Sequence, residues 1–353
     1  MEIAWKIVLF SLGVVLILAV VRSGAKVAFM NYPSSEFISR TISRTIYGLY
    51  RLFLSDRRGY VTLQKRLYWF SPLFLFGMIL AYFGIMLFGF ALIYWSVGAE
   101  ASLANSCLAS GSALSTLGFY TPHMVSGEVI SIIEGGFGLG VVVFLITFIP
   151  GYQSAVQQRE DHAACLYART NQSPDCESFY RWIVRFDLQN SMSAIWLQWE
   201  DYIRMIGDTH CDSPVLLFTP STRTGQSWVV VVQAVLDAAN FAASALQPQH
   251  VHGAKSCLQE GIYSMTRVAQ SNPIRYCLPQ NDGVADVVRG DFNTVCRHLA
   301  SLGFELKDDL DAAWNTFDEN RKRYESALTV LAHLSFVPMD HRLLKAAASN
   351  DGR

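Results

Sequence analysis

Charged residues are scarce in this chain of 353 residues, and their scarcity narrows the class of protein. Lysine, arginine, aspartate and glutamate make up 16% of the sequence, whereas hydrophobic residues make up 51%. Soluble domains carry a charge on about a quarter of their residues. The deficit indicates a membrane protein, and the length leaves room for a second region with a core of its own.

Several functional signatures are also missing. The sequence has no basic tail and no interleaving of aromatic and basic residues of the kind that nucleic-acid-binding proteins use. It has no P-loop, nucleophile elbow or pair of catalytic acids, and no glycine fingerprint follows a strand. We therefore expect neither an enzyme nor a nucleic-acid partner, and no cofactor.

The seven cysteines form no repeated CxxC pair, and most of them follow residue 152. We place that region in the cytoplasm, where thiols stay reduced, so a disulfide framework is not expected. Histidine lies near cysteine in "HAAC" (162–165) and "HC" (210–211), but neither stretch completes a set of four ligands. No metal site is predicted.

Three apolar runs are long enough to cross a bilayer, which takes about 20 mostly apolar residues per helix. They lie at residues 3–21, 71–98 and 128–151. The first run is followed by basic residues and has no clear small-x-small cleavage site, which favours a membrane anchor (residues 1–22) over a cleaved signal peptide. The sequence predicts an all-α membrane protein with three transmembrane helices.

Lysine and arginine in the loops predict the orientation of these helices. The stretch 99–127 has no lysine or arginine, so we place it outside the cell. The connector at 23–70, with Arg22 just before it, is rich in basic residues and has only two acids, Glu36 and Asp56, so we place it in the cytoplasm. Its basic residues are Lys26, Arg40, Arg44, Arg51, Arg57, Arg58, Lys65 and Arg66. The N-terminus is then outside and residues 152–353 are cytoplasmic, in a multi-pass protein of the inner (plasma) membrane.

The segment "SLANSCLASGSALSTLGFYTP" (102–122) is too short and polar to span a bilayer, and too apolar for an ordinary exposed loop. Asn105 and Ser106 can cap a short helix that runs to about Leu114, after which the chain turns extended. Non-helical backbone at membrane depth is tolerated only where it is buried in protein or lines water. The segment is therefore read as a re-entrant pore loop. The other reading is an amphipathic external loop that packs on the two flanking helices.

Residues 71–151 resemble the pore module (helix, pore loop, helix) of bacterial two-helix potassium channels. Their filter signature is Thr-Val/Ile-Gly-Tyr/Phe-Gly-Asp, and this chain has "TLGFYT" at 116–121. Four residues match the signature, whereas Tyr120 stands where the second glycine belongs and Thr121 where aspartate is common. The matching residues are Thr116, Leu117, Gly118 and Phe119. A filter with one glycine is also similar to potassium transport proteins with four degenerate pore repeats.

More loosely, "IPGYQSAVQQRE" (149–160) and "SWVVVVQAVLDAAN" (227–240) are similar to a group of uncharacterised bacterial ion-channel-like membrane proteins. The resemblance implies a passive cation channel, with potassium the expected ion, whose filter is made by residues 116–120. One pore loop cannot enclose an ion path, so a homotetramer is implied. Tyr120 leaves the choice between potassium and sodium open. It also supports the alternative of a non-conducting membrane receptor or scaffold with a channel-like fold.

Residues around the loop are candidates for supporting the filter or attracting cations: Ser112, Ser115, Thr121 and Glu134. A carboxylate inside a membrane is a functional candidate by default, and Glu134 could pair with Ser112 or Thr116. The other reading is an acid near the interface that outside water solvates. Glu100, His123 and Glu128 flank the outer mouth, where acids would concentrate cations and where inconsequential exposed residues are equally expected.

Glycines in the third apolar run, "GGFGLG" (135–140), place Gly136 and Gly140 on a GxxxG face. Such a face suits close helix packing, and a hinge is the second possibility.

The cytoplasmic region, 152–345, is expected to be mostly helical. Apolar residues recur at helical spacing over 178–207, and further helices are predicted at 226–246, 254–270, 285–302 and 307–337. Trp182, Trp196 and Trp199 are expected in the core, and the tail 346–353 is predicted to be disordered. We expect this region to gate or assemble the pore, and the sequence indicates no ligand for it.

Overall fold

The computed structural model describes residues 2–29, 41, 45, 48, 60–248, 251–271 and 289–337. These residues form helices, and the one β-feature among them is an isolated bridge between Leu246 and Leu306. The fold is therefore all-α over the described chain, as predicted. Most of the predicted basic connector and the predicted disordered tail (346–353) lie outside the described residues.

Two compact units make up the chain. Unit 1 consists of residues Met1–Ile46 and Pro72–Ser154, and unit 2 of Tyr47–Ser71 and Ala155–Arg353. The predicted border between membrane and cytoplasmic parts, at 151/152, lies close to the border between the units in the chain. Helix α6 (Val125–Arg169) contributes to both units.

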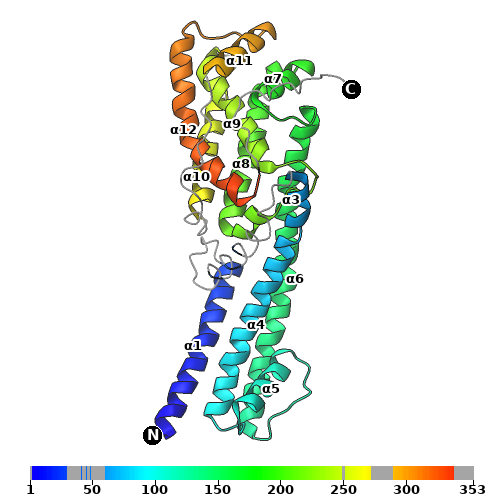
Figure 1. Cartoon of the computed structure of the whole chain (residues 1–353), viewed down its shortest axis with the longest axis vertical. Coiled ribbons are helices and arrows are strands. Elements are labelled where there is room, and N and C mark those ends of the chain that lie inside the picture. The colour runs from blue at the N-terminus through cyan, green and yellow to red at the C-terminus, as the bar shows by residue number, and fades with distance from the viewer. Residues whose placement is uncertain are drawn as a thin grey trace. The chain divides into compact units, whose positions relative to one another are not determined.

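Unit 1 contains α1 (Glu2–Phe29), most of α4 (Phe70–Ser96), α5 (Leu103–Leu114) and the first part of α6 (Figure 1). Helices α1 and α4 approach closely at two glycines, since a Cβ on Gly13 would lie 2.5 Å from the carbonyl oxygen of Gly89. Its core takes residues from α1, α4, the turn after α4 and α5: Ile17, Val20, Met86, Phe90, Ile93, Tyr94, Ala99, Ala109 and Leu114.

Within the described residues, four helical stretches are long and apolar enough to cross a membrane: Ile3–Gly24, Tyr60–Ser96, Val125–Val143 and Trp228–Ala245. Burial separates the last from the others, because it is 94% buried inside the protein whereas the first three are 17–22% buried. The first three expose most of their apolar surface, as helices in hydrocarbon do. The fourth is the core helix of unit 2, and it confirms the helix predicted at 226–246.

Helix α6 is longer than the predicted span at 128–151, because it continues past Pro150 to Arg169. A proline inside a helix costs about 3 kcal/mol through the lost hydrogen bond and the clash with the preceding turn. Beyond that proline, the side chains of Arg159, Ala163 and Leu166 are fully buried in unit 2. We infer that this packing offsets the cost and keeps the helix continuous.

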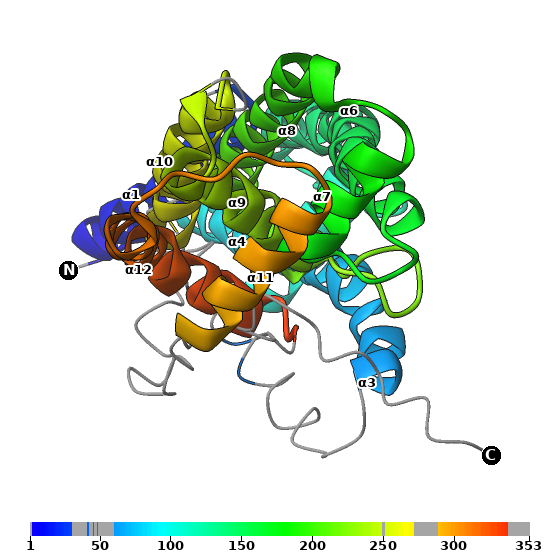
Figure 2. The ribbon, with the colours of Figure 1, turned by 90° about the horizontal axis from the view of Figure 1, so that it is seen from above.

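Unit 2 is a helical bundle around α9 (Trp228–Ala245). Figure 2 shows α9 in the centre of the bundle, and it contacts four of the surrounding helices: α7 (Cys176–Arg185), α8 (Met192–Asp212), α10 (Ala254–Ser271) and α12 (Leu310–Leu334). The unit also contains α3 (Tyr60–Leu67), α11 (Arg289–Ser301), the C-terminal part of α6 and the 3-10 helix η2 (Pro214–Phe218). Trp182, Trp196 and Trp199 are buried, which confirms their prediction as core residues.

Helix α9 is apolar enough for a membrane, but one of its faces carries a seam of buried polar residues: Gln233, Asp237, Asn240 and Ser244. The Tyr324 hydroxyl of α12 donates to Oδ1 of Asp237 at 2.6 Å. Nδ2 of Asn240 donates to the Phe317 carbonyl at 2.8 Å. The seam thus finds its partners on another helix of the same unit, so α9 belongs in a protein core.

The helix predicted over 178–207 is in fact two helices, α7 and α8. Between them lies a 3-10 turn, η1 (Gln189–Ser191), and Asp187 has φ +55°. Aspartate tolerates this left-handed conformation better than most residues, because its short polar side chain bonds locally. Apolar residues recur at helical spacing on both sides of this break, so the sequence pattern did not indicate that the helix ends there.

Candidate functional site

Helix α5 begins and ends with serine contacts. The hydroxyl of Ser102 accepts a hydrogen bond from the backbone N–H of Asn105 at 3.2 Å, so Ser102 is the N-cap. The prediction of Asn105 and Ser106 as caps was wrong by one turn, because Ser102 already has the extended backbone that an N-cap needs. At the other end, Oγ of Ser115 donates to the Gly111 carbonyl at 2.6 Å.

The chain leaves α5 through two residues with left-handed backbone. Thr116 has φ +59° and Gly118 has φ +67°. Glycine adopts this conformation freely, whereas a β-branched threonine resists it at a cost of about 1–3 kcal/mol. Strain of this kind tends to occur at functional sites, so Thr116 marks the segment that follows α5 as a candidate.

Ser112 holds the segment after α5 in place. Its side chain is fully buried, and its hydroxyl accepts a hydrogen bond from the backbone N–H of Tyr120 at 2.8 Å. Its carbonyl oxygen accepts from the N–H of Gly118 at 3.3 Å. The N–H of Thr116 donates to the Ala113 carbonyl at 3.0 Å. Three alternate N–H groups, those of residues 116, 118 and 120, are therefore directed toward α5, and Ser112 supports this segment through both of its oxygen atoms.

The carbonyl oxygens of residues 116–120 have no such partners. Within the described parts of the chain, none of these five carbonyls accepts a hydrogen bond. The side chains of Leu117 and Phe119 are also 72% and 67% exposed. We call residues 116–120 the open segment. The segment is thus held on α5 through its N–H groups, whereas its carbonyls and its apolar side chains stay available to water, ions or another chain.

Tyr120 is held at both ends. Besides the contact of its N–H with Ser112, its hydroxyl donates to Oε2 of Glu100 at 2.9 Å. Its φ is not in the left-handed region, in contrast to Gly118. Glu100 is buried, so the expectation of an exposed acid at the outer mouth is wrong for this residue. The residue that departs from the potassium-channel signature thus anchors the end of the open segment.

Glu134 is fully buried and, among the described residues, makes no hydrogen bond with Ser112 or Thr116. Its Oε1 lies 2.5 Å from Oγ of Ser110, a residue that the sequence analysis did not single out. Burial also rules out the reading of an acid solvated by outside water. The other two candidates near the open segment do not hold it, because Ser115 bonds within its own turn and Thr121 is exposed.

The glycines of α6 divide into two sets. A Cβ on Gly138 would lie 2.0 Å from the carbonyl oxygen of Leu114, so only glycine lets α6 reach the end of α5. A Cβ on Gly136 or Gly140 would meet nothing within 4 Å. The predicted GxxxG pair therefore makes no close packing within one copy of unit 1, and its use between copies stays a prediction.

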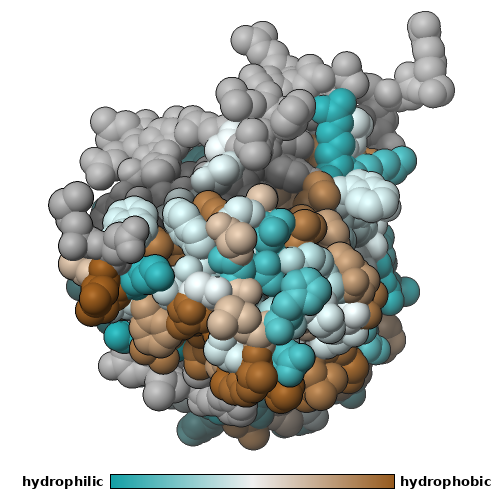
Figure 3. All heavy atoms as spheres, turned by 90° about the horizontal axis from the view of Figure 1, so that it is seen from below, coloured by the Kyte–Doolittle hydropathy of each residue, from teal (hydrophilic) through white to brown (hydrophobic). Residues whose placement is uncertain are grey.

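Exposed apolar side chains gather around the open segment. They come from α5, the open segment and the start of α6: Leu108, Leu117, Phe119, Met124 and Val125. Figure 3 shows hydrophobic residues interspersed with hydrophilic ones on the face seen from below.

Comparisons of the chain with protein-family models, curated proteins and solved structures find no match. The geometry of unit 1 is therefore the basis for assigning a function to this segment.

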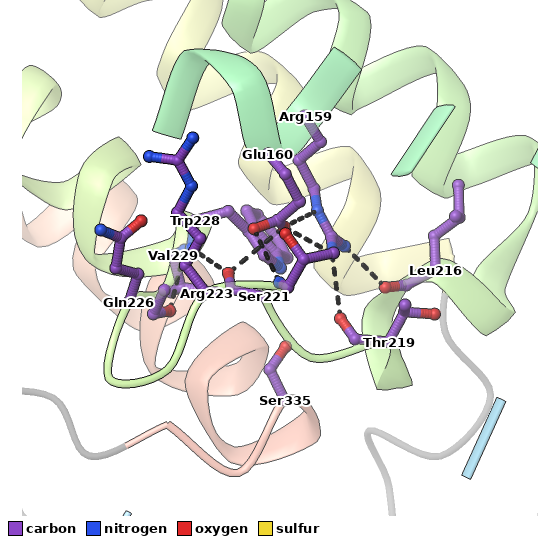
Figure 4. Close-up of polar contacts among 12 residues, drawn as sticks. Arg159, Glu160, Leu216, Thr219, Ser221, Arg223, Gln226, Trp228, Val229 and Ser335 are labelled. Carbon is purple, nitrogen blue, oxygen red and sulfur yellow. Dashed lines mark hydrogen bonds and ion pairs between the residues drawn. The ribbon is translucent and has the colours of Figure 1, made fainter. Parts of the chain in front are cut away.

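A second polar cluster lies in unit 2, at the C-terminal part of α6 (Figure 4). The buried guanidinium of Arg159 pairs with Glu160 at 2.8 Å and donates to the carbonyls of Leu216 and Thr219 at 2.9 and 3.0 Å. Oε2 of Glu160 accepts from the N–H of Thr222 at 3.2 Å. These contacts bind α6 to η2, which contains Leu216, and to the loop at 219–227, which we call the clamp loop.

Helix α3 binds the same loop. The side chain of Gln64 is fully buried and donates to the carbonyls of Ser221 and Arg223 at 2.7 and 2.9 Å. Its Oε1 accepts from the N–H of Gly225 at 2.7 Å. The hydroxyl of Tyr68 donates to the Ser221 carbonyl at 3.0 Å. The sequence did not indicate these contacts, because a single glutamine in a short polar helix gives no signal of burial.

Proposed function

We propose that the protein is a passive monovalent cation channel in which the open segments of four copies line the ion path. In this proposal, α1, α4 and the first part of α6 are the three transmembrane helices, and α5 with the open segment is a re-entrant pore loop. The basic connector faces the cytoplasm and the loop faces outside, as the distribution of lysine and arginine predicts. Potassium is the expected ion.

The observation that carries the proposal is the row of five carbonyl oxygens without hydrogen bonds, at residues 116–120. The segment lies in sequence between two helices that are apolar enough to cross a membrane. Backbone carbonyls in such a place must bind water, ions or another chain, because hydrocarbon cannot satisfy them. A ring of carbonyls can replace the hydration shell of a cation.

Four copies are proposed because one copy supplies only one wall of a path. Leu117 and Phe119 are largely exposed in the single chain, and other copies would cover them. Cyclic symmetry around the path then gives each open segment the same position.

Unit 2 would transmit a signal to the pore helices or hold the copies together. The clamp loop favours this role, because it binds α3, which directly precedes α4 in the chain, and also α6. A movement of the loop would therefore reach both helices that flank the open segment in sequence.

The test is cation flux into proteoliposomes that contain the full-length protein. We expect uptake of potassium and rubidium by the wild type, and a loss in Gly118→Val, because Gly118 has φ +67° and valine resists that backbone. Gly84→Val is the matched control, because Gly84 lies in α4 with nothing within 4 Å of an added Cβ. Sodium flux, measured in parallel, decides the selectivity that Tyr120 leaves open.

The mass of the protein in nanodiscs accompanies the flux measurement. A tetramer that passes no cation would overturn the proposal and favour a receptor or scaffold with a channel-like fold. A monomer or dimer would exclude a path shared among four copies.

A further inference from the structure

Glu134 is a buried acid without a counter-charge. The sequence has no lysine or arginine between Arg66 and Arg159, a stretch that includes α4, α5 and most of α6. Among the described residues, Glu134 takes part in no ion pair. An ionised carboxylate in such a place loses its hydration with nothing to replace it, and buried charges are normally paired.

The contacts of Glu134 contain one hydrogen too few if the acid is ionised. Oγ of Ser110 lies 2.5 Å from Oε1 of Glu134 and 2.9 Å from the Leu87 carbonyl oxygen. A serine hydroxyl carries a single hydrogen. With a carboxylate and a carbonyl as the two neighbours, both are acceptors, and one of the two oxygen–oxygen contacts would have no hydrogen between its atoms.

A proton on the acid removes this conflict. We propose that Glu134 is a neutral carboxylic acid at neutral pH, which donates from Oε1 to Ser110 while Ser110 donates to the Leu87 carbonyl. Each short contact then holds one hydrogen. Oε2, which is buried without a hydrogen-bond partner, becomes a neutral carbonyl oxygen, and such an oxygen is far less costly to bury than a carboxylate oxygen.

This chain of hydrogen bonds joins three helices, because Leu87 lies in α4, Ser110 in α5 and Glu134 in α6. Ser110 lies two residues before Ser112, whose oxygens hold Gly118 and Tyr120. Glu134 is therefore a positioning residue that acts on the open segment through α5. The inference deepens the proposed function by naming this residue, but the protonation state can be measured without any ion flux.

The other polar group of α4 near Glu134 is Tyr94, whose hydroxyl lies 2.8 Å from Oγ of Ser131. The Tyr94 hydroxyl carries no positive charge, so it cannot act as a counter-charge for an ionised Glu134. The competing explanation is an ionised Glu134 that binds a cation behind the open segment. The two explanations differ in whether the carboxyl group of Glu134 is protonated. Infrared spectroscopy distinguishes a protonated carboxyl group from a carboxylate directly.

The experiment compares infrared spectra of the full-length protein in nanodiscs for wild type and Glu134→Gln at neutral pH, in sodium-free buffer with and without potassium. We expect the difference spectrum to show the loss of a carbonyl-stretch band of a protonated carboxyl group, unchanged by potassium. Subtraction removes the bands of all other acids. Glu128→Gln changes an exposed acid in the same helix and should remove only a carboxylate band.

A second pair of variants tests the donor role. Glu134→Gln keeps a donor for Ser110 and should unfold at a temperature close to that of the wild type, whereas Glu134→Ala should unfold at a lower one. Ser110→Ala should keep the protonated band but shift its frequency, because the acid loses its acceptor. This variant also serves if Glu134→Gln does not fold.

Loss of only a carboxylate band from Glu134→Gln, or a protonated band that potassium abolishes, would overturn the inference. Equal destabilisation by glutamine and alanine would overturn the donor role. A protonated band in a protein without cation flux would leave the inference standing and refute the channel.

Discussion

His210 lies in unit 2 between a guanidinium and an indole ring. Its Nε2 is 3.2 Å from a terminal nitrogen of Arg159, and its ring centroid is 4.9 Å from that of Trp228. Complete burial, together with the charge of Arg159, holds the pKa of His210 well below its usual value. The imidazole is thus neutral, with Nε2 accepting from Arg159 and Nδ1 donating to the Ile206 carbonyl at 3.1 Å.

Protonation of this histidine should destabilise the fold in mild acid. The folded pKa is lowered, so below the unfolded value of about 6.5 the unfolded chain binds one more proton than the folded chain. One proton corresponds to a loss of about 1.4 kcal/mol of unfolding free energy for each pH unit below that value. We expect His210→Gln to reduce this loss, as measured by thermal unfolding of the full-length protein between pH 7 and 5.

The control for this measurement is His252→Gln, which replaces an exposed histidine and should keep the sensitivity of the wild type to acid. An equal pH slope in wild type and His210→Gln would show that other groups cause the loss.

At the scale of elements, the contact between α5 and α6 depends on a single glycine. A Cβ on Gly138 would lie 2.0 Å from the Leu114 carbonyl, a backbone atom that cannot move alone. We expect Gly138→Ala to push the two helices apart and destabilise the protein by about 1–3 kcal/mol, as measured by thermal unfolding. The shift should also weaken cation flux, because α5 carries Ser112.

Gly84→Ala makes the same chemical change in α4 where an added Cβ meets nothing within 4 Å, and it should be tolerated. Equal stability of Gly138→Ala and Gly84→Ala would contradict the close packing of α5 on α6.

Gly136→Ala tests contacts between copies of the protein. It has no neighbour within one copy, so a loss of assembly in this variant would assign the GxxxG face to contacts between copies.

At the scale of the whole molecule, unit 2 brings together segments far apart in sequence. Gln64 contacts Ser221, and Glu160 contacts Thr222, so the clamp loop meets two helices from distant parts of the chain. Both contacts use buried side chains and backbone groups of the loop. Removal of one partner leaves backbone groups of the loop without their hydrogen bonds, and for a group that stays buried this costs more than the hydrogen bond itself contributes.

We therefore expect Gln64→Leu to loosen the clamp loop. The loss should be about 1–3 kcal/mol for each backbone group that stays buried without a partner. Trypsin should cleave after Arg223, which is exposed, faster than in the wild type. Thr62→Leu, on an exposed position of the same helix, should cleave at the wild-type rate. Unchanged cleavage in Gln64→Leu would show that the loop is held by other contacts.

Much of this organisation could be predicted from residue patterns. Long apolar runs are sufficient to predict the helices of unit 1, because any run of that length must leave water. The short α5 followed by a non-helical segment was visible from hydroxyl-rich composition and the glycine at 118, whereas the left-handed backbone of Thr116 was not. The burial of Trp182, Trp196 and Trp199 was also predictable, because large aromatic side chains at helical spacing favour a core.

The errors share a physical reason, which is that partners distant in sequence decide local outcomes. Helix α6 continues past Pro150 because later residues pack in unit 2. Periodicity likewise could not reveal the break at Asp187.

The sequence by itself determined the all-helical class, the apolar stretches and the absence of lysine and arginine between Arg66 and Arg159, since each depends only on residue types along the chain. Only the tertiary structure decided that Glu134 meets Ser110, that Tyr120 turns to Glu100, and that the carbonyls of residues 116–120 have no partner. Hydrogen bonds form over about 3 Å, and only folding brings distant residues so close.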